Sequence, residues 1–323
     1  MSDILFIMSI KQKSVTYLEI SANKAGQRID NFLYTHLKGV PKSHIYRILR
    51  TGEVRINKGR IKPSYRLNAN DVLRLPPIKC QTIIPKVPNA NRLTELANAT
   101  LYEDDLILII NKPSGIAVHG GTGINGGVIE GLRVLYPKAP SLELVHRLDR
   151  ETSGCLMIAK KHSMLRRLHN LLRCGEIHKQ YLALVQGHWK PRRTQVNAPL
   201  RKNVLKSGER IVRVSPDGKS AITQFSIERQ FATTTLLKVK LLTGRTHQIR
   251  VHAAHVGNPI AGDNKYGNDS FNQQMRHDYN LKHLFLHASK LDIDLPEIKY
   301  HLSIEAPLPP SLQQVVNNLD VKI

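Results

Sequence analysis

A proline-rich stretch in the first third of the chain divides the sequence into two parts. Residues 76–98 combine four prolines with Asn89 and Asn91, a composition typical of an extended linker without helix or strand. A chain of 323 residues is long enough for two domains, each with its own buried core. We therefore predict an N-terminal extension over residues 1–14, a small domain over 15–79, a linker over 80–98 and a large domain over 99–323.

The small domain shows two helical patterns and several short strands. Apolar residues recur at helical spacing in Gln27–Leu37 and again in Ser43–Arg50. A strand is expected within residues 15–23, and two more at Glu53–Ile56 and Asp71–Leu75. These patterns predict a small α/β domain.

The small domain is also strongly basic. Residues 24–79 contain thirteen Lys and Arg against three Asp and Glu, and the whole chain has a net charge of +23. A solvated surface normally mixes both signs, so this bias predicts a polyanionic partner. Aromatic residues make up only 5% of the chain, so phosphate contacts rather than base stacking should supply most of the affinity.

Two segments of this domain, Gly26–Asp30 and Gly52–Asn57, resemble an S4-type RNA-binding domain. The resemblance implies that structured RNA is bound through its shape and backbone. The candidate RNA-binding residues are Lys42, Arg47, Arg50, Arg55, Lys58 and Arg60.

The large domain mixes strands and helices without repeating a βαβ unit. The expected strands are Leu106–Ile110, Gly154–Ala159, Tyr181–Val185, Thr223–Arg229, Leu236–Leu242, Leu284–His287 and Leu302–Glu305. The expected helices are Val128–Leu135, Ser163–Arg173 and Ser311–Leu319. Residues 192–215 are polar, and we expect an irregular, protruding excursion that faces RNA. This order predicts an α+β fold with a mixed, largely antiparallel sheet and flanking helices.

The most informative motif of the chain is the segment His146–Gly154. Asp149 lies between Arg147 and Arg150, and a Thr-Ser-Gly turn follows before an apolar strand. A carboxylate held among cations stays ionised at neutral pH, which suits a nucleophile or charge stabiliser better than a proton donor. Taken alone, the motif is equally compatible with an acid that caps a turn and pairs with its neighbours.

Three other patterns resemble parts of known catalytic or binding motifs, but each lacks residues that the motif requires. Gly121–Gly126 matches G-x-G-x-x-G but does not lead from a strand directly into a helix, which disfavours a dinucleotide or methyl-donor site. The group His247, His252 and His255 lacks the Cys or paired acids of a metal site, and roles near phosphate suit it better. The letters of a Ser-His-Asp triad occur near Asp149, but a G-x-S-x-G elbow is missing. We predict neither a metal nor a cofactor.

The cysteines and the apolar runs indicate in which cellular compartment the protein is expected. Cys80, Cys155 and Cys174 are scattered and odd in number, as expected in a reducing compartment. The apolar patch Ile4–Met8 is too short for a signal core, and Met8 is a candidate alternative start. No run approaches the ~18 apolar residues of a membrane-spanning helix. We expect a cytoplasmic protein, acting as a monomer and away from membranes.

A single candidate acid also restricts the reaction. Hydrolysis of a glycosidic bond normally uses two carboxylates, and the sequence offers no clear partner for Asp149. One nucleophile suffices when the leaving base returns to the same sugar, because no water must be activated. Isomerisation of uridine is such a reaction.

His146–Gly154 resembles the signature of the large-subunit and transfer-RNA pseudouridine synthases that share an H-R-L-D-x-x-T-S-G motif, the RluA-type family. The resemblance extends over roughly residues 15–315 and implies cofactor-free isomerisation of specific uridines in large-subunit (23S) ribosomal RNA. Within it, Asp149 is the nucleophile, attacking either the sugar C1′ or the base, and Arg250 pairs with this acid.

The resemblance also implies roles for three further residues. Tyr181 packs against the flipped uracil and assists proton removal from C5. Arg147 enters the space that the extruded base leaves, and Leu286 forms an apolar wall. Two other classes remain open from the residues alone. A non-catalytic RNA-binding or ribosome-assembly protein would not need an acid, a tyrosine and an arginine from separate segments, and an RNA methyltransferase would need a methyl-donor loop.

Overall fold

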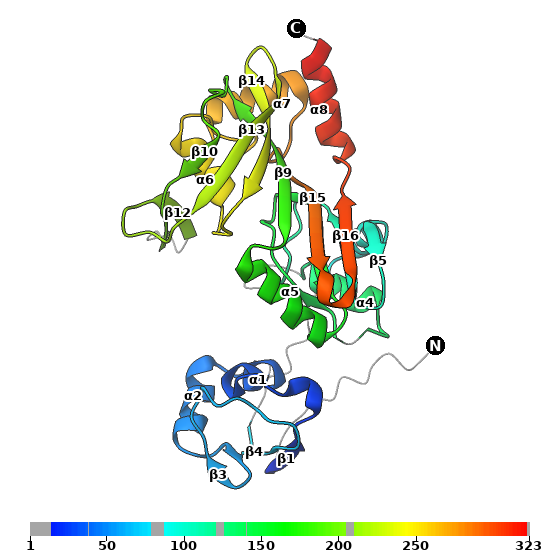
Figure 1. Cartoon of the computed structure of the whole chain (residues 1–323), viewed down its shortest axis with the longest axis vertical. Helices are drawn as coiled ribbons and strands as arrows, with labels where there is room; N and C mark the ends of the chain where they lie inside the picture. Colours follow the sequence, from blue (N-terminus) through cyan, green and yellow to red (C-terminus); the bar gives the residue numbers. More distant parts are fainter. Residues whose placement is uncertain are drawn as a thin grey trace. The chain divides into compact units, whose positions relative to one another are not determined.

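The computed structural model describes residues 14–37, 39–78, 87–120, 126–139, 141–204 and 210–321 (Figure 1). The chain divides into two compact units, Met1–Pro85 and Lys86–Ile323. Nearly all of the expected extension over residues 1–14 lies outside the described residues, and so do Cys80 and most of the glycine loop Gly121–Gly126.

The small unit combines two helices with a small antiparallel sheet. Its elements are β1 (Thr16–Glu19), the 3-10 helix η1 (Ala22–Lys24), α1 (Ile29–His36), α2 (Lys42–Arg50), β2 (Arg55–Ile56), β3 (Gly59–Arg60) and β4 (Val72–Leu75). The strand order is β1-β4-β2-β3, antiparallel throughout. Leu33 of α1, Ile48 of α2 and Leu73 of β4 are fully buried in one apolar core. The two helices and the small sheet predicted from the sequence are confirmed.

The large unit contains the remaining elements. Its strands are β5 (Thr100–Glu103), β6 (Ile107–Lys112), β7 (Glu143–Leu144), β8 (Ser153–Ala159), β9 (His178–Gln186), β10 (Gln195–Asn197), β11 (Leu200–Val204), β12 (Arg210–Val214), β13 (Ile222–Gln230), β14 (Thr234–Leu241), β15 (Leu286–Leu295) and β16 (Tyr300–Glu305). Its helices are α3 (Ala90–Ala97), α4 (Val128–Leu135), α5 (His162–Cys174), α6 (Gln248–His255), α7 (Asp269–Tyr279), α8 (Pro310–Val321) and the 3-10 helix η2 (Pro296–Ile298). Every strand and helix predicted for this unit overlaps an observed one.

Within the described ranges, ten strands of the large unit form one sheet. The order is β10-β13-β14-β9-β15-β8-β6-β5, with β16 paired to β15 and β7 paired to β8. All neighbours are antiparallel except β8 and β15, which run parallel. The predicted mixed, largely antiparallel sheet is therefore confirmed. The parallel pair lies at the motif His146–Gly154, because β8 begins at Ser153, within the motif.

Helices cover the sheet through two apolar clusters. Leu96 of α3, Leu132 of α4 and Leu168 of α5 join the main core. A second cluster contains Phe271 of α7 and Val315 of α8, packed with residues of β9 and β14. Figure 1 shows α7 and α8 near one end of the large unit and α4 and α5 near the other. In the part of the chain that is described, no helix is long and apolar enough to cross a membrane.

The expected linker over residues 80–98 is wrong where α3 forms. The Asn89 side chain accepts a hydrogen bond from the backbone N–H of Arg92 (3.0 Å) and so caps α3. A Cβ built on Gly131 of α4 would lie 2.7 Å from Leu96 Cδ1, so the two helices pack closely. The asparagines that suggested a turn therefore begin a helix, and tertiary packing stabilises it although its apolar stripe is short.

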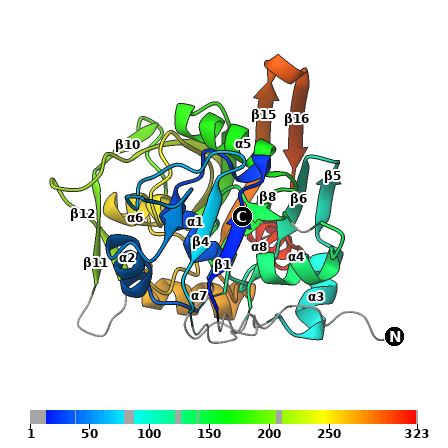
Figure 2. The ribbon, with the colours of Figure 1, turned by 90° about the horizontal axis from the view of Figure 1, so that it is seen from below.

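The expectation of an irregular excursion over residues 192–215 is also wrong in its secondary structure. This region contains β10, which joins the sheet, and the antiparallel hairpin of β11 and β12. Figures 1 and 2 show the hairpin projecting at the outer edge of the large unit, next to α6. Of its side chains, Leu200 and Val212 are buried. An exposed hairpin with so few buried residues gives too weak an alternation to be recognised in the sequence.

Besides α3, the helices α6 and α7 were not predicted. Six consecutive residues of α6 (Gln248–Ala253) are buried, so the helix has no apolar stripe on one side. The sequence of α7 is mostly polar, and its start is fixed by Asn268, whose side chain accepts from Phe271 N–H. Neither sequence shows the 3.6-residue pattern of an amphipathic helix.

Candidate active site

Asp149 lies on the loop between β7 and β8, and this loop is fixed along β8. Val145 N–H donates to Met157 O (3.1 Å), and Met157 N–H donates to Nε2 of His146 (3.1 Å). Burial lowers the pKa of His146 to about 3, so the neutral ring accepts this bond. Thr152 N–H donates to Asp149 O (3.1 Å) and closes a turn. The conformation of the His-Arg-Leu-Asp segment is therefore set by its neighbouring strand.

The Ser-Gly end of the motif holds β8 against β15. Gly154 has a φ of +107°, and a Cβ there would lie 2.2 Å from Ala288 O. Ser153 Oγ lies 2.9 Å from His287 Nδ1, and His287 Nε2 lies 3.0 Å from Ala306 O. Burial lowers the pKa of His287, so the neutral ring donates from Nε2 to the carbonyl and accepts at Nδ1 from the serine. These motif residues are structural.

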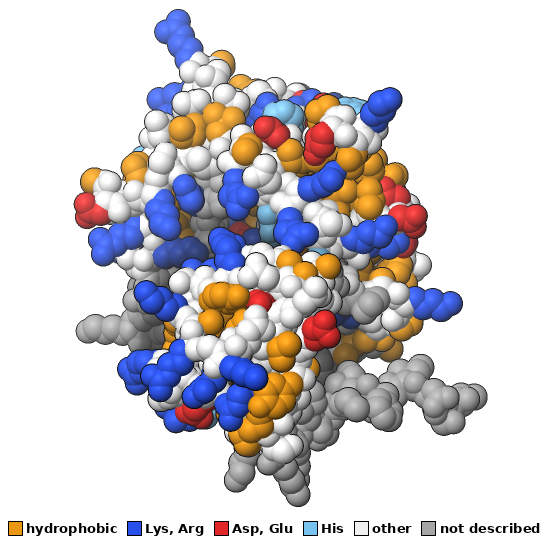
Figure 3. Space-filling view, turned by 60° about the horizontal axis from the view of Figure 1, so that its bottom comes forward, with side chains coloured by type: hydrophobic (Ala, Val, Ile, Leu, Met, Phe, Trp, Pro, Cys, Tyr) orange, Lys and Arg blue, Asp and Glu red, His pale blue; other side chains and the backbone are white. Residues whose placement is uncertain are grey.

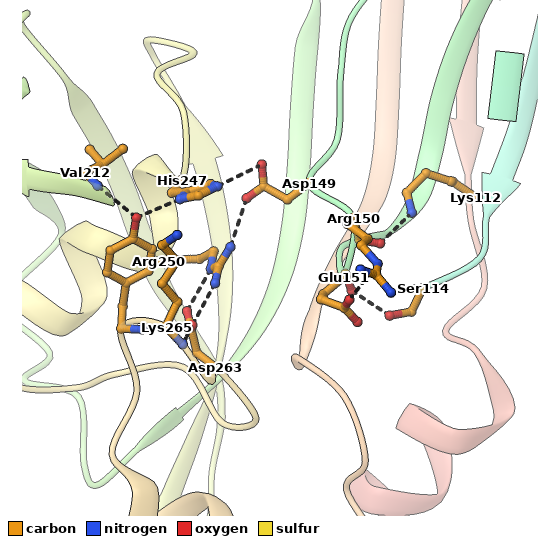
Figure 4. A network of polar contacts seen from close by, with 11 residues as sticks. Lys112, Ser114, Asp149, Arg150, Glu151, Val212, His247, Arg250, Asp263 and Lys265 are labelled. Atoms are coloured by element: carbon orange, nitrogen blue, oxygen red, sulfur yellow. Dashed lines mark hydrogen bonds and ion pairs between the residues drawn. The ribbon is translucent and has the colours of Figure 1, made fainter. Parts of the chain in front are cut away.

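A buried lysine supports the residues after Asp149. Lys112 Nζ donates to the carbonyl oxygens of Pro113 (2.6 Å) and Ile116 (2.9 Å). It also donates to the carbonyl oxygen of Arg150 (3.1 Å), a contact that Figure 4 shows. The side chain is fully buried, and burial lowers its pKa to about 7 despite the nearby charges of Glu151 and Asp149. Lys112 thus ties the end of β6 to the loop that carries the acid.

Arg250, on α6, approaches Asp149 while it is held by a second acid. Its Nε and Nη2 donate to the two oxygens of Asp263 at 2.8 and 2.7 Å, whereas Nη1 lies 3.4 Å from Asp149 Oδ2. Burial disfavours the charge of Arg250, but the hydrogen bonds and charge of Asp263, with the charge of Asp149, outweigh it and raise the pKa. The guanidinium also lies 5.0 Å from the ring centroid of Tyr266. Arg250 is therefore a fixed cation beside Asp149.

His247 faces the other oxygen of Asp149. It precedes α6 with a left-handed φ of 54°, and its Nε2 lies 3.8 Å from Asp149 Oδ1. Its Nδ1 lies 2.7 Å from the hydroxyl of Tyr266, which accepts from Val212 N–H at 3.0 Å. Burial lowers the pKa of His247, an effect only partly offset by Asp149. The imidazole is therefore neutral at neutral pH.

The loop before α6 is anchored by a buried glutamine. Gln248 Oε1 accepts from Thr243 Oγ1 (2.8 Å) and from Arg245 N–H (2.9 Å), and its Nε2 donates to Ile222 O (3.0 Å). Because the side chain is buried, these bonds are shielded from water. The segment from Thr243 to Arg250 is consequently rigid, and it presents His247 and Arg250 together.

These elements line a pocket of about 530 Å³. It brings together all five site residues proposed from the sequence: Asp149, Tyr181, Arg250, Arg147 and Leu286. Tyr181 on β9 and Leu286 on β15 come from adjacent strands and are buried, whereas Arg147 is exposed. Burial raises the pKa of Tyr181, and the charge of Asp149 raises it further, so the phenol stays protonated.

Three residues of the site network were missed in the sequence: Asp263, Tyr266 and Lys112. Asp263 and Tyr266 lie in a polar loop segment that has no distinguishing pattern. Lys112 did carry a signal, since it ends a strand that begins with four buried apolar residues, and a lysine in such a strand needs hydrogen-bond partners if it is buried. His252, expected near phosphate, is instead buried, with its ring nitrogens 2.9 Å from Thr223 Oγ1 and Ala198 O.

The small unit presents the basic residues proposed to contact RNA. All six have exposed side chains: Lys42, Arg47, Arg50, Arg55, Lys58 and Arg60. Arg47, Arg50 and Arg60 line one groove between α2 and β3. Lys42 Nζ lies 4.8 Å from the centroid of the Tyr34 ring. In Figure 3, Lys and Arg side chains are spread over the visible face, with few acidic side chains among them.

Comparison with known families agrees with both parts of this description. Residues 106–255 match the RNA pseudouridylate synthase family, and residues 27–73 match the S4 domain. The first match includes Asp149, Tyr181 and Arg250. The second spans α1 to the start of β4.

Individual relatives resemble nearly the whole chain. The ribosomal large subunit pseudouridine synthase C of Pasteurella multocida is 53% identical over 309 residues, which are 95% of this chain and 94% of that protein. The protein of the same name from Salmonella typhimurium is 53% identical over 97% of this chain and 99% of its own. Among solved structures, human RNA Pseudouridylate Synthase Domain Containing 4 is 25% identical, with a TM-score of 0.59, covering 71% of this chain and 96% of that one.

A mixed sheet domain that matches the RNA pseudouridylate synthase family, in one chain with an S4 domain, identifies an RNA-modifying enzyme. The chain belongs to the RNA pseudouridine synthase family, in the RluA-type branch that shares the H-R-L-D-x-x-T-S-G motif. It is accordingly an isomerase, and the family resemblance seen in the sequence is confirmed.

Proposed function

We propose that this enzyme converts specific uridines of large-subunit (23S) ribosomal RNA to pseudouridine. The support comes from the relatives named ribosomal large subunit pseudouridine synthase C, which are 53% identical to this chain, and from the exposed basic residues of the S4 unit. In the reaction the N1–C1′ bond breaks, uracil turns, and a C5–C1′ bond forms. The hydrogen on C5 is lost and N1 gains one, so no atom or electron is exchanged overall and no cofactor is required.

Asp149 is the proposed nucleophile, attacking either C1′ or the base. The observation that carries this role is its position in the pocket, with Arg250 beside Oδ2 and His247 beside Oδ1. Arg250 Nη1, 3.4 Å from Asp149 Oδ2, stabilises the charge of the carboxylate. At this distance it makes no short hydrogen bond that would occupy the oxygen lone pairs. Asp263 takes the two short bonds of Arg250, so the guanidinium aims at Asp149 without depending on it.

Tyr181, Leu286 and Arg147 are proposed to receive the extruded base. Tyr181 and Leu286 form adjacent buried walls of the pocket, which suits the flat apolar faces of uracil. The raised pKa of Tyr181 keeps its proton in place, which favours packing over the role of base at C5. Arg147 is exposed at the pocket and is proposed to fill the space that the base vacates.

The remaining proposals concern where and how the enzyme works. Cys155 is buried and Cys174 exposed, both as free thiols, which suits a reducing, cytoplasmic setting. The proposed site residues all come from one chain, so a monomer suffices for catalysis. The S4 unit is proposed to hold the ribosomal RNA through Lys42, Arg47, Arg50, Arg55, Lys58 and Arg60.

The test uses unmodified large-subunit ribosomal RNA and the full-length protein. We expect conversion of discrete uridines without added cofactor, detected by carbodiimide treatment and primer extension. Asp149→Asn keeps the shape of the side chain, and it should bind this RNA with unchanged affinity but not convert it. Conversion by the asparagine variant at the wild-type rate would remove Asp149 from the reaction.

A further inference from the structure

We propose that a second groove, directly beside the catalytic pocket, binds the RNA backbone that flanks the target uridine. This flanking groove is defined by Arg201, Lys202, Asp217, Lys219 and residues 244–246, and it measures about 340 Å³. All of its lining residues belong to the large unit. The inference rests on the proposed function, because it names where the neighbouring nucleotides of that substrate lie.

The flanking groove is continuous with the catalytic pocket. Gly244, Arg245 and Thr246 line both. A Cβ built on Gly244 would meet no atom within 4 Å, so there is open space beside this shared lining residue. A base held next to Asp149 belongs to a chain that must leave the pocket, and this junction offers an exit into the groove.

The charge of the flanking groove fits a phosphodiester backbone. Its four basic residues are exposed: Arg201, Lys202, Lys219 and Arg245. Asp217, the one acidic residue among the described lining residues, lies 3.7 Å from Arg201, and both side chains are more than half exposed. An exposed pair at this distance contributes little, so Arg201 can exchange the carboxylate for a phosphate. Among the residues that the structure describes, no aromatic side chain lines the groove, which favours backbone binding over base stacking.

The groove is rigidly connected to the catalytic machinery. Leu200 and Val212 of the β11–β12 hairpin pack with Val251 of α6, next to Arg250. Val212 N–H donates to Tyr266, which in turn contacts His247. Arg245 Nε donates to the backbone oxygen of Ser220 (3.0 Å), the residue after Lys219. A phosphate bound here would therefore sit in fixed register with Asp149, which positions the target nucleotide at little entropic cost.

The first test removes two cations from the groove. We expect Arg201→Ala with Lys219→Ala to weaken binding of a short single-stranded RNA, which carries a uridine that the wild type converts, about tenfold in Kd. The slope of log Kd against log salt should fall by about 1.4, the value for two lost phosphate contacts on a single strand. The matched control is Lys138→Ala with Arg276→Ala, which removes the same charge from exposed residues of the large unit outside both spaces. The control should leave Kd unchanged.

Two further variants keep every basic residue of the groove. One is expected to strengthen RNA binding and the other to reduce conversion of the RNA. Asp217→Asn removes the competing carboxylate and should tighten RNA binding about twofold, which a purely structural role would not produce. Gly244→Leu places a side chain in open space at the junction, so the fold should be kept while conversion of the RNA falls at least tenfold. Circular dichroism checks that both variants are folded.

Neutral methylphosphonate linkages then locate the contact on the RNA. One such linkage immediately beside the target uridine should weaken binding to the wild type but add no loss in the double variant. If the double variant binds like its matched control, or if Gly244→Leu converts RNA like the wild type, the groove assignment is wrong. Failure of the wild type to convert any ribosomal RNA would instead contradict the proposed function, so the two failures are distinguishable.

Discussion

Asp263 holds Arg250 with two hydrogen bonds, 2.8 Å to Nε and 2.7 Å to Nη2, and leaves Nη1 directed at Asp149. Asp263 has a side-chain exposure of 1%, and its carboxylate also accepts from the backbone N–H groups of Lys265 and Tyr266. Burial opposes its charge, but the hydrogen bonds and charge of Arg250 prevail and lower its pKa. The cation beside the proposed nucleophile is therefore oriented by an acid outside the pocket.

Asp263→Asn should reduce both activity and stability. The amide keeps the size of the side chain but offers one acceptor, so Arg250 loses a bond and its counter-charge. We expect the free energy of unfolding to fall by about 3 kcal/mol, the usual range for a broken buried pair. Conversion should fall at least about a hundredfold, as when a charge-stabilising contact is lost. Urea unfolding followed by the fluorescence of Trp189, the single tryptophan, reports on the large unit alone.

A surface ion pair of the same type provides the control. Arg229 and Asp320 are paired but largely exposed, so Asp320→Asn should cost less than about 1 kcal/mol and leave conversion unchanged. Equal losses in the two variants would show that burial of the Arg250–Asp263 pair is unimportant.

Lys112 should make the stability of the large unit rise with pH. Its pKa is about 7 in the folded protein, against an ordinary value of 10.5. Between these values the unfolded chain holds one more proton than the folded one, so raising the pH favours folding. The slope approaches about 1.4 kcal/mol per pH unit. Lys112→Met should lose this slope when urea unfolding is compared between about pH 7.5 and about pH 9.5. Parallel curves for the two proteins would mean that the lysine is not neutralised by burial.

Gly154→Ala should prevent normal pairing of β8 with β15. The new Cβ would lie 2.2 Å from Ala288 O, and the backbone has a φ of +107°. We expect a loss of more than about 4 kcal/mol, or no folded large unit. Gly175→Ala is the matched control, because its φ is also positive but its Cβ would meet nothing within 4 Å. That change should cost only about 1 to 2 kcal/mol by thermal unfolding. Similar losses would attribute the effect to φ rather than to the neighbouring strand.

Tyr266→Phe should change the proton position on His247. The tyrosine oxygen accepts from Val212 N–H, so its own proton is directed to His247 Nδ1, and the neutral ring carries its proton on Nε2, facing Asp149. Nitrogen-15 NMR of labelled histidines should show this tautomer in the wild type, with a pKa below 6.5, and its loss in the variant. Conversion should fall about fivefold, the equivalent of one hydrogen bond.

The control for this change is Tyr102→Phe, which removes a hydroxyl on β5 that donates to Asp104, directly after the strand. It should leave the His247 signals and the conversion rate unchanged. An unaltered His247 tautomer in Tyr266→Phe would show that the hydroxyl does not set the proton position.

Local sequence patterns were sufficient to predict helices and strands where the spacing of apolar residues is regular. The helices α1, α2 and α5 and the buried strand β8 have clear apolar spacing, and each was predicted near its observed bounds. The pattern failed for α3 and α6, whose stability depends on neighbours in the fold. Leu96 of α3 packs against α4 at Gly131. Six consecutive residues of α6 are buried, so this helix has no exposed polar face that would reveal its spacing. A sequence window does not contain those neighbours.

The sequence by itself indicated a chain of two parts, the basic S4 module and the motif around Asp149 that places the chain in its family, because charge bias and a continuous nine-residue motif are local properties. Tertiary structure decided which other residues meet Asp149. Arg250 reaches it from 101 positions away, and Asp263 aims that arginine from a segment with no pattern of its own. Electrostatic interactions depend on distance in space and on burial, so only the folded chain specifies a fixed cation, a neutral histidine and an open neighbouring groove around one carboxylate.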